Sequence, residues 1–178
     1  MHMKKKVVFL VFALVLIAVP IYIIFSSEAI LEKGHQHKVK LEGFDPFDPF
    51  RGKYLMLNYD FSVDCDQTME EGDVGFVVLE KDENGFSYFS KVTILAPNHD
   101  DYVKCTVYNV YNGKAEIQID NIGKYFINES KAKSAEELLM ESVQIDSNGS
   151  YATIRVLNGE CRLEEVYVKG KPLKSFFQ

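Results

Sequence analysis

The feature that most limits what this chain can fold into is a run without a charged side chain, VVFLVFALVLIAVPIYIIF, over residues 7–25. As a helix, this run is close to the length needed to cross the hydrocarbon core of a bilayer. Pro20 is tolerated inside a transmembrane helix. A cleaved signal peptide is the competing interpretation, but its apolar region would be shorter, and Ser27-Glu28-Ala29 is a poor cleavage site. We therefore predict a retained transmembrane helix.

Charges on either side of the run predict its orientation. Lys4, Lys5 and Lys6 precede it and Glu28 follows it, so the positive-inside rule places the N-terminus in the cytoplasm. The prediction is a single-pass protein of the cell membrane with an extracytoplasmic C-terminal domain. Its parts are a cytoplasmic basic tail, a transmembrane helix and an extracytoplasmic domain, over residues 1–6, 7–25 and 26–178.

The part of the chain beyond the run is acidic. Three of the 20 Lys and Arg residues precede the run, which leaves 17 against 26 Asp and Glu. An acidic exterior without a basic stripe argues against nucleic acid as a partner. The 3 cysteines are too few for a disulfide framework. Cys65 and Cys105 could pair and leave Cys161 over, or all three could be small apolar side chains within strands.

Short alternating segments separated by turn residues predict a β-rich domain. Asn-Gly pairs at residues 84–85, 112–113 and 158–159 are the strongest short hairpin signal. The connections are too short for crossover helices, so antiparallel order is expected. The predicted fold is mainly β, an antiparallel barrel-like or sandwich-like domain with one short helix. Strands are expected over residues 35–41, 53–62, 74–80, 86–96, 103–111, 114–121, 125–127, 151–157 and 162–169.

Two helical segments are expected outside the apolar run. Residues 26–33 can continue as a short helix that Gly34 ends, because glycine is a good C-terminal cap residue. Ser134 and Glu137 fit a capping box ahead of an apolar stretch, which predicts the clearest helix of the domain. The core is expected to contain Leu55, Leu57, Tyr59, Phe76, Val78, Val92, Ile94, Ile117, Ile119, Ile154 and Val156.

Residues 43–59 combine a stiff segment with a strongly alternating strand. Two Asp-Pro pairs stiffen the segment, because proline fixes its own φ and restricts the residue before it. Phe44, Phe47 and Phe50 are spaced along it, and such a segment cannot easily bury all three rings. Aromatic side chains suit protein recognition, so these rings are candidate contacts for a protein partner.

Arg51 has two interpretations. As a binding residue it would clamp an anion or a carboxylate at the mouth of the sheet, aided by Tyr59. As a structural residue it would pair with Asp45 or Asp48, while Gly52 supplies a backbone conformation that other residues resist. The candidate binding residues are Arg51, Gly52, Tyr54, Tyr59 and Phe47.

Two groups of side chains have the chemistry of metal ligands. His35 and His37 fall on one face of a strand, and residues 99–101 (HDD) could fold toward them, but no third ligand follows from spacing. Asp60, Asp64 and Asp66 could seat a cation, but the pattern of a calcium loop is missing. We predict no metal site and no cofactor.

Hydrolase chemistry finds no support in the local sequence. A nucleophilic serine needs a base held against it. No serine of this chain lies in a compact turn setting with a partner lysine. We therefore identify no catalytic residues and expect a protein without catalysis.

Residues 52–59 (GKYLMLNY) resemble the motif of the GDYXXLXY family, with Lys53 where the family has Asp. The resemblance extends from the lead-in at residues 48–51 to blocks at 72–80, 123–127 and 163–173, and it includes the apolar run. It implies a bacterial, membrane-anchored protein of no assigned activity. Some members are encoded beside polytopic membrane proteins, which implies such a protein as a partner. If the family's Asp binds a metal or a cation, Lys53 would not.

Two hypotheses follow. The first is a membrane-anchored extracytoplasmic module that binds another membrane or envelope protein. The alternative is a small-ligand binder or hydrolase with a cleft around Arg51, Tyr54 and the edge from Asp60 to Asp66. The alternative requires a concave polar pocket with converging ionisable groups at that place.

Overall fold

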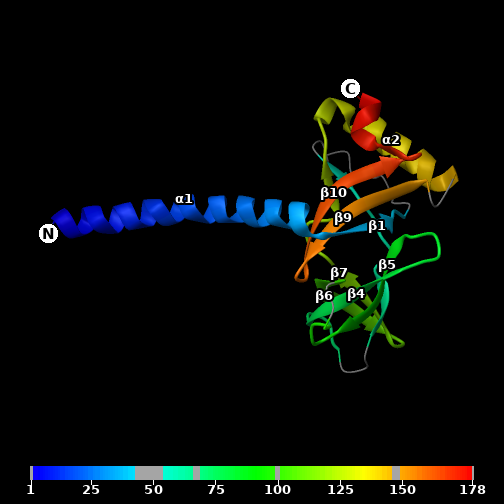
Figure 1. Ribbon diagram of the computed structural model, residues 1–178, viewed down its shortest axis with the longest axis horizontal. Coiled ribbons are helices and arrows are strands. Elements are labelled where there is room, and N and C mark those ends of the chain that lie inside the picture. Colours follow the sequence, from blue (N-terminus) through cyan, green and yellow to red (C-terminus); the bar gives the residue numbers. More distant parts are fainter. Residues whose placement is uncertain (1, 43–53, 66–68, 99–100, 146–148, 178) are drawn as a thin grey trace.

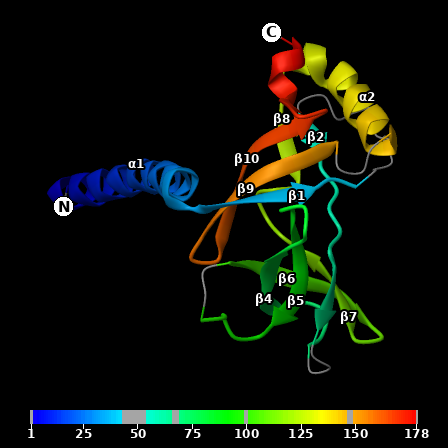
Figure 2. The ribbon, with the colours of Figure 1, turned by 45° about the vertical axis from the view of Figure 1, so that its right-hand side comes forward.

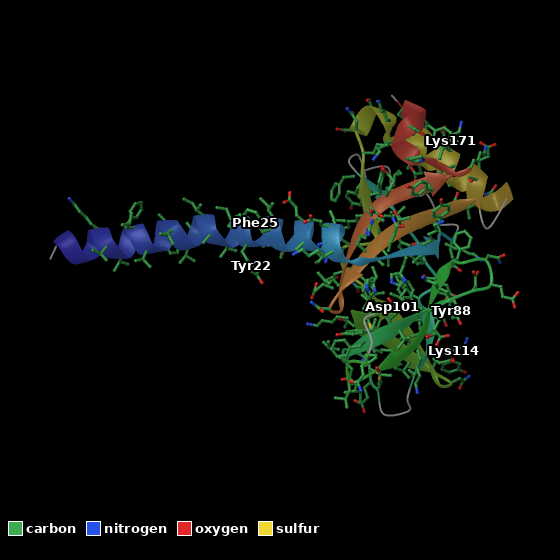
Figure 3. The ribbon with its side chains drawn as sticks, viewed as in Figure 1. Tyr22, Phe25, Tyr88, Asp101, Lys114 and Lys171 are labelled. Carbon is green, nitrogen blue, oxygen red and sulfur yellow. The ribbon has the colours of Figure 1, made fainter. Side chains whose placement is uncertain are left out.

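A computed structural model describes residues 2–42, 54–65, 69–98, 101–145 and 149–177. Helix α1 (His2–Lys33) projects as a single rod from a β-rich domain (Figure 1). Its apolar part packs against none of the described residues of the domain, and Tyr22 and Phe25 are 74% and 67% exposed (Figure 3). The segment is long and apolar enough to cross a membrane. The short helix expected after the apolar run is the last part of this same helix.

The domain is built on a nine-stranded sheet of order β11-β10-β9-β1-β5-β3-β7-β6-β4. A further pairing of β4 with β5 closes β5, β3, β7, β6 and β4 into a five-stranded barrel. A separate sheet pairs β2 with β8. The strands are β1 (His35–Lys40), β2 (Tyr54–Met56), β3 (Ser62–Cys65), β4 (Val74–Lys81), β5 (Ser87–Thr93), β6 (Tyr102–Tyr111), β7 (Lys114–Gln118), β8 (Lys124–Phe126), β9 (Ser150–Leu157), β10 (Glu160–Val168) and β11 (Lys171–Pro172).

Strand β1 joins two halves of the domain. On one side it pairs antiparallel with β9 over six residue pairs, from His35↔Val156 to Lys40↔Tyr151. On the other side it meets β5 of the barrel through one parallel pair, Val39↔Ser87. Figure 2 shows β1, β9 and β10 in the middle, with the barrel strands at one end and α2 (Glu129–Ile145) with the C-terminus at the other. The predicted mainly β, barrel-like or sandwich-like domain is confirmed and contains a barrel, but the expected antiparallel order is incomplete, because β5 runs parallel to both β1 and β3.

The Asn-Gly hairpins are confirmed. Asn112 and Asn158 have positive φ angles of 51° and 52°, and the glycines that follow have 78° and 82°. Two successive residues with positive φ make the turn whose twist matches a two-residue hairpin, and Asn and Gly tolerate this conformation best. These turns fix the registers of β6 with β7 and of β9 with β10.

Two local predictions are wrong. The strand expected over residues 53–62 is two short strands, β2 and β3, which pair with different partners. Helix α2 begins before Ser134, and Asn128 caps it by accepting a hydrogen bond from the backbone N–H of Ser130 on its Oδ1. Asparagine at this position is as good a cap as serine. A short 3₁₀ helix, Leu173–Phe177, follows β11.

The core contains eight of the expected residues, and three expectations fail. Leu55, Leu57, Tyr59, Val92, Ile117, Ile119, Ile154 and Val156 are buried. Phe76 and Val78 are only partly buried, because Gly75, Val77 and Leu79 are the residues of β4 that face the core. Ile94 lies beyond the end of β5 and is 53% exposed. An unbroken apolar run on β4 gives no alternation from which to choose the inward face.

The two neighbouring valines of β4 test this assignment. Val77→Ala removes two methyl groups from a side chain that is 0% exposed, so we expect the free energy of unfolding to fall by about 2 kcal/mol. Val78→Ala, on the outer face, is expected to cost less than about 1 kcal/mol. Urea unfolding of the full chain in detergent measures both values. Equal losses, or a larger loss for Val78→Ala, would contradict the assignment.

Candidate functional site

The tyrosines at residues 54 and 59 point to opposite sides of their segment. Tyr59 is buried, and its hydroxyl donates a hydrogen bond to the Ile122 carbonyl at 2.9 Å. Burial raises the pKa of Tyr59 above its usual value, so the phenol stays protonated and its role is structural. The Tyr54 ring lies partly exposed beside Phe126, and the Lys124 ammonium sits 5.1 Å from its centroid. The other candidate binding residues, Arg51, Gly52 and Phe47, lie outside the described residues, as do Phe44 and Phe50.

A cavity of about 870 Å³ opens between β10, the end of β7 and the small β2–β8 sheet. We call it the large cavity. Its lining mixes apolar, amide and charged side chains, and Phe126 on its rim is 73% exposed. Tyr54 does not line it. The lining residues are Met56, Leu57, Asn58, Phe61, Gln118, Ile119, Asp120, Asn121, Gly123, Lys124, Tyr125, Phe126, Arg162, Leu163 and Glu164.

The β10 wall of the large cavity also holds the end of α1. Arg162 Nε donates a hydrogen bond to Ser27 Oγ at 3.2 Å. Glu164 pairs with Arg155, whose Nη2 lies 2.9 Å from Glu164 Oε1, and Arg155 Nη1 donates to the Gly34 carbonyl at 3.1 Å. Burial raises the pKa of Glu164, but hydrogen bonds from Gln36 and Arg155 and the charge of Arg155 lower it more, so it is held below its usual value. The carboxylate therefore stays charged at neutral pH.

Gly34 is the residue that lets α1 lie this close to the sheet. It ends the helix as predicted, and its N–H donates to the Ile30 carbonyl at 2.9 Å. The φ angle of Gly34 is not positive, so a left-handed cap conformation does not explain why glycine is needed here. A Cβ at this position would lie 2.5 Å from the Ile30 oxygen and 3.0 Å from the Val156 oxygen. Both are backbone atoms, which cannot rotate away, and Ile30 is itself buried against the domain.

A second, shallower cavity of about 490 Å³ lies on the outer face of β3, β6 and β7. We call it the Tyr108 cavity. It shares Phe61 and Gln118 with the large cavity, so the two are contiguous. Asp60 and Ser62 place part of the predicted Asp60–Asp66 edge in its wall, whereas Asp66 lies outside the described residues. The lining residues are Asp60, Phe61, Ser62, Tyr108, Glu116, Ile117 and Gln118.

The Asp101 carboxylate lies beside the rings of both histidines of β1. His35 Nδ1 and His37 Nε2 each lie 3.2 Å from Asp101 Oδ1, and His37 Nδ1 lies 3.0 Å from Ser87 Oγ. The His37 Nε2 contact has the distance of an ion pair but not the geometry of a hydrogen bond. Figure 3 labels Asp101 between β1 and the barrel strands. These contacts reinforce the seam at which β1 meets β5 by one backbone pair.

The cluster is structural rather than catalytic. Ser87, His37 and Asp101 are the residue types of a hydrolase triad. Ser87 is 2% exposed, however, so a substrate carbonyl cannot reach its oxygen. The His37 side chain is also 2% exposed, so it is buried in the seam rather than turned to solvent. No group of three or more His, Cys, Asp or Glu able to hold a metal ion occurs among the described residues, and His99 and Asp100 lie outside them.

The cysteines occupy three different strands. Cys105 and Cys161 are buried free thiols on β6 and β10, so Cys65 and Cys105 do not form a disulfide in this structure. Burial raises the pKa of each of these two thiols to about 12. Thiols with such a pKa are unreactive at neutral pH.

Spacing along the sequence does not identify the residues that organise these features. Asp101 and Ser87 come to His37 only through the barrel, and Arg155 and Arg162 reach α1 only through the β9–β10 hairpin. The sequence places Arg155 and Arg162 on strands that flank an Asn-Gly turn, but it carries no signal that this hairpin lies beside the end of α1. Tyr108 and Glu116 carry no spacing signal, because their meeting depends on the register of β6 with β7.

The fold and its leading helix define a class, a β-barrel-containing domain carried on an N-terminal apolar helix. The chain belongs to the GDYXXLXY family, since the model of the GDYXXLXY protein matches residues 16–166. The resemblance at residues 52–59 is therefore confirmed. Comparisons with curated proteins and with solved structures found no match.

Gly34→Ala tests the close approach of α1 to the sheet. We expect this substitution to cost about 1–3 kcal/mol, because the added methyl forces two backbone segments apart. Hydrogen exchange of the backbone amides at the end of α1 and at Val156 should accelerate. Gly123→Ala is the matched control, since a Cβ there meets nothing within 4 Å. Equal exchange in both variants would contradict the role of Gly34.

The His37 environment predicts a loss of stability in weak acid. Burial lowers the pKa of His37, as do the charges of Lys81 and His35, while Asp101 raises it, with a net lowering from 6.5. The unfolded chain thus binds the proton more readily, so the free energy of unfolding falls as the pH falls below about 6.5, by up to about 1.4 kcal/mol per pH unit.

Urea unfolding of the full chain between pH 7.5 and pH 5 measures this slope, and His37→Gln should reduce it. The pKa of Asp101 is also lowered, by its histidine neighbours against the effect of burial, so its contribution is lost only at a more acidic pH. The same slope in His37→Gln and the unsubstituted chain would contradict the assignment.

Proposed function

We propose that this chain is a single-pass membrane protein whose β domain lies outside the cytoplasm and binds another membrane or envelope protein at the large cavity. The observation that carries the proposal is the fixed connection between α1 and the domain. One residue, Gly34, separates α1 from β1, and hydrogen bonds from Arg155 and Arg162 tie the domain to the helix end.

The anchor is supported by the run from Val7 to Phe25, whose side chains do not pack on the part of the domain that the structure describes. The lysines before the run support a cytoplasmic N-terminus. On this proposal, residues 26–33 extend the helix beyond the apolar run by about 12 Å, and the β domain lies close above the membrane surface. In this orientation the domain has little freedom to turn away from the bilayer.

The large cavity supports a partner that lies beside α1. Arg162 and Glu164 form its wall, and both belong to the network that holds the helix end. Phe126 on its rim offers a large exposed ring, and such rings are enriched at the centre of protein interfaces. A polytopic membrane protein standing next to α1 would reach this rim with its extracytoplasmic loops.

Site-specific photo-cross-linking in intact cells tests the proposal. A photoreactive amino acid in place of Phe126 should capture one membrane protein in the membrane fraction, and Phe126→Ser should abolish its co-purification in mild detergent. The matched control is Leu95, which is 80% exposed and lines neither cavity, so the same changes there should have no effect. The partner should reproducibly be the same protein, identified by mass spectrometry.

Two results would contradict the proposal. Equal capture from positions 95 and 126 would mean that the rim has no specific partner. Recovery of the protein as a soluble form beginning near Ile30, detected by intact mass, would mean that the helix is removed rather than retained.

A further inference from the structure

The Tyr108 cavity has features that the proposed function does not use. Its floor is the barrel wall formed by β3 and β7, where Ser62 pairs with Glu116. Phe61 forms its inner side, and this ring is held in place by Tyr59 and Phe89, with centroid distances of 5.5 Å to each. The cavity therefore has an aromatic wall whose ring is fixed by two neighbouring rings.

The second aromatic ring of the cavity belongs to Tyr108, which lies at a register shift in β6. The pairing of β6 with β7 slips between Val107 and Asn109, so Tyr108 is an extra residue opposite β7. Its side chain is 65% exposed and lines the cavity, while Val107 is buried in the barrel. Such bulges redirect a side chain and are over-represented next to functional sites.

The charge of the Tyr108 cavity is negative. Asp60 and Glu116 line it, and none of the described residues that line it is a lysine or an arginine. Asp60 is fixed because its Oδ1 accepts a hydrogen bond from the Ser62 N–H at 3.0 Å. Within the part of the chain that the structure describes, the Glu116 carboxylate has no hydrogen bond or ion pair.

The Asp64 carboxylate on β3 has a different charge environment from that of Asp60 and Glu116. Asp64 is paired by register with Lys91 on β5 and with Lys114 on β7, so lysines stand on both sides of it. Lys114 is also the nearest basic residue to Glu116 along β7, two positions away. Lys114 forms no ion pair with Glu116 among the described contacts, and Asp64 does not line the cavity, so Asp60 and Glu116 supply its negative charge.

We propose that the Tyr108 cavity binds an arginine side chain of the partner protein. This inference rests on the proposed function and names the chemistry of a second contact. A guanidinium can stack on the face of Tyr108 or Phe61 and donate hydrogen bonds to Asp60 and Glu116 together. A lysine ammonium would gain the charge attraction but not the planar, forked contact.

Titration of the full chain in detergent micelles with short blocked peptides tests this contact. The probes are Gly-Arg-Gly, Gly-Lys-Gly and Gly-citrulline-Gly, where citrulline has nearly the shape of arginine without its charge. We expect the arginine peptide to shift the backbone amide NMR signals of Tyr108 and Glu116 with a Kd of about 1 mM. The lysine peptide should bind more weakly, and the citrulline peptide should not bind.

Glu116→Gln should weaken arginine binding about tenfold, because it removes the charge and keeps the shape. Asp64→Asn, the matched control on the same face, should leave binding unchanged. Absence of arginine binding up to about 10 mM, equal binding of the citrulline peptide, or equal effects of the two substitutions would each overturn the inference. The peptide assay needs no partner, so its failure is separate from failure of the cross-linking at Phe126.

Discussion

The pairing of β1 with β9 is the interaction on which the rest of the structure depends. It begins at His35, two residues after α1 ends, and continues for the whole length of β1. The same strand then passes to the barrel through Val39 and Ser87. Helix, open sheet and barrel are thus connected through one strand of six residues. Side-chain contacts reinforce the part of this connection that has the fewest backbone pairs. His37 contacts Ser87 and Asp101, and Lys40 forms an ion pair with Asp82.

Sequence patterns predicted the parts of the fold that depend on local chemistry. The apolar run, the Asn-Gly turns and the alternation of Leu55, Leu57 and Tyr59 all have local physical causes, and each appears as expected. The inward face of β4 was not predictable in this way, because Phe76, Val77 and Val78 are all apolar. The start of α2 failed for a related reason, since Asn128 and Ser134 are both competent caps and only packing decides between them.

The candidate sites were less predictable than the fold. Both cavities are made by residues from segments far apart in the sequence, which come together only through the pairing of β2 with β8, β3 with β7 and β6 with β7. The paired histidines of β1 were visible from their spacing, but their burial and their partner Asp101 were not. Two of the motif residues described, Leu57 and Tyr59, turned out to build the core. The motif that marks the family is therefore, in its described part, mainly a requirement of folding.

The short connection at Gly34 has a mechanical consequence. A longer linker would absorb any change in the helix axis, but here β1 begins immediately after α1 and Arg155 and Arg162 brace the corner. Tilting or rotating α1 would therefore turn the whole β domain together with the helix. Both cavities would then move, and the displacement of each would grow with its distance from Gly34. A neighbour that pushed on the helix inside a bilayer would in this way reorient surfaces well outside it.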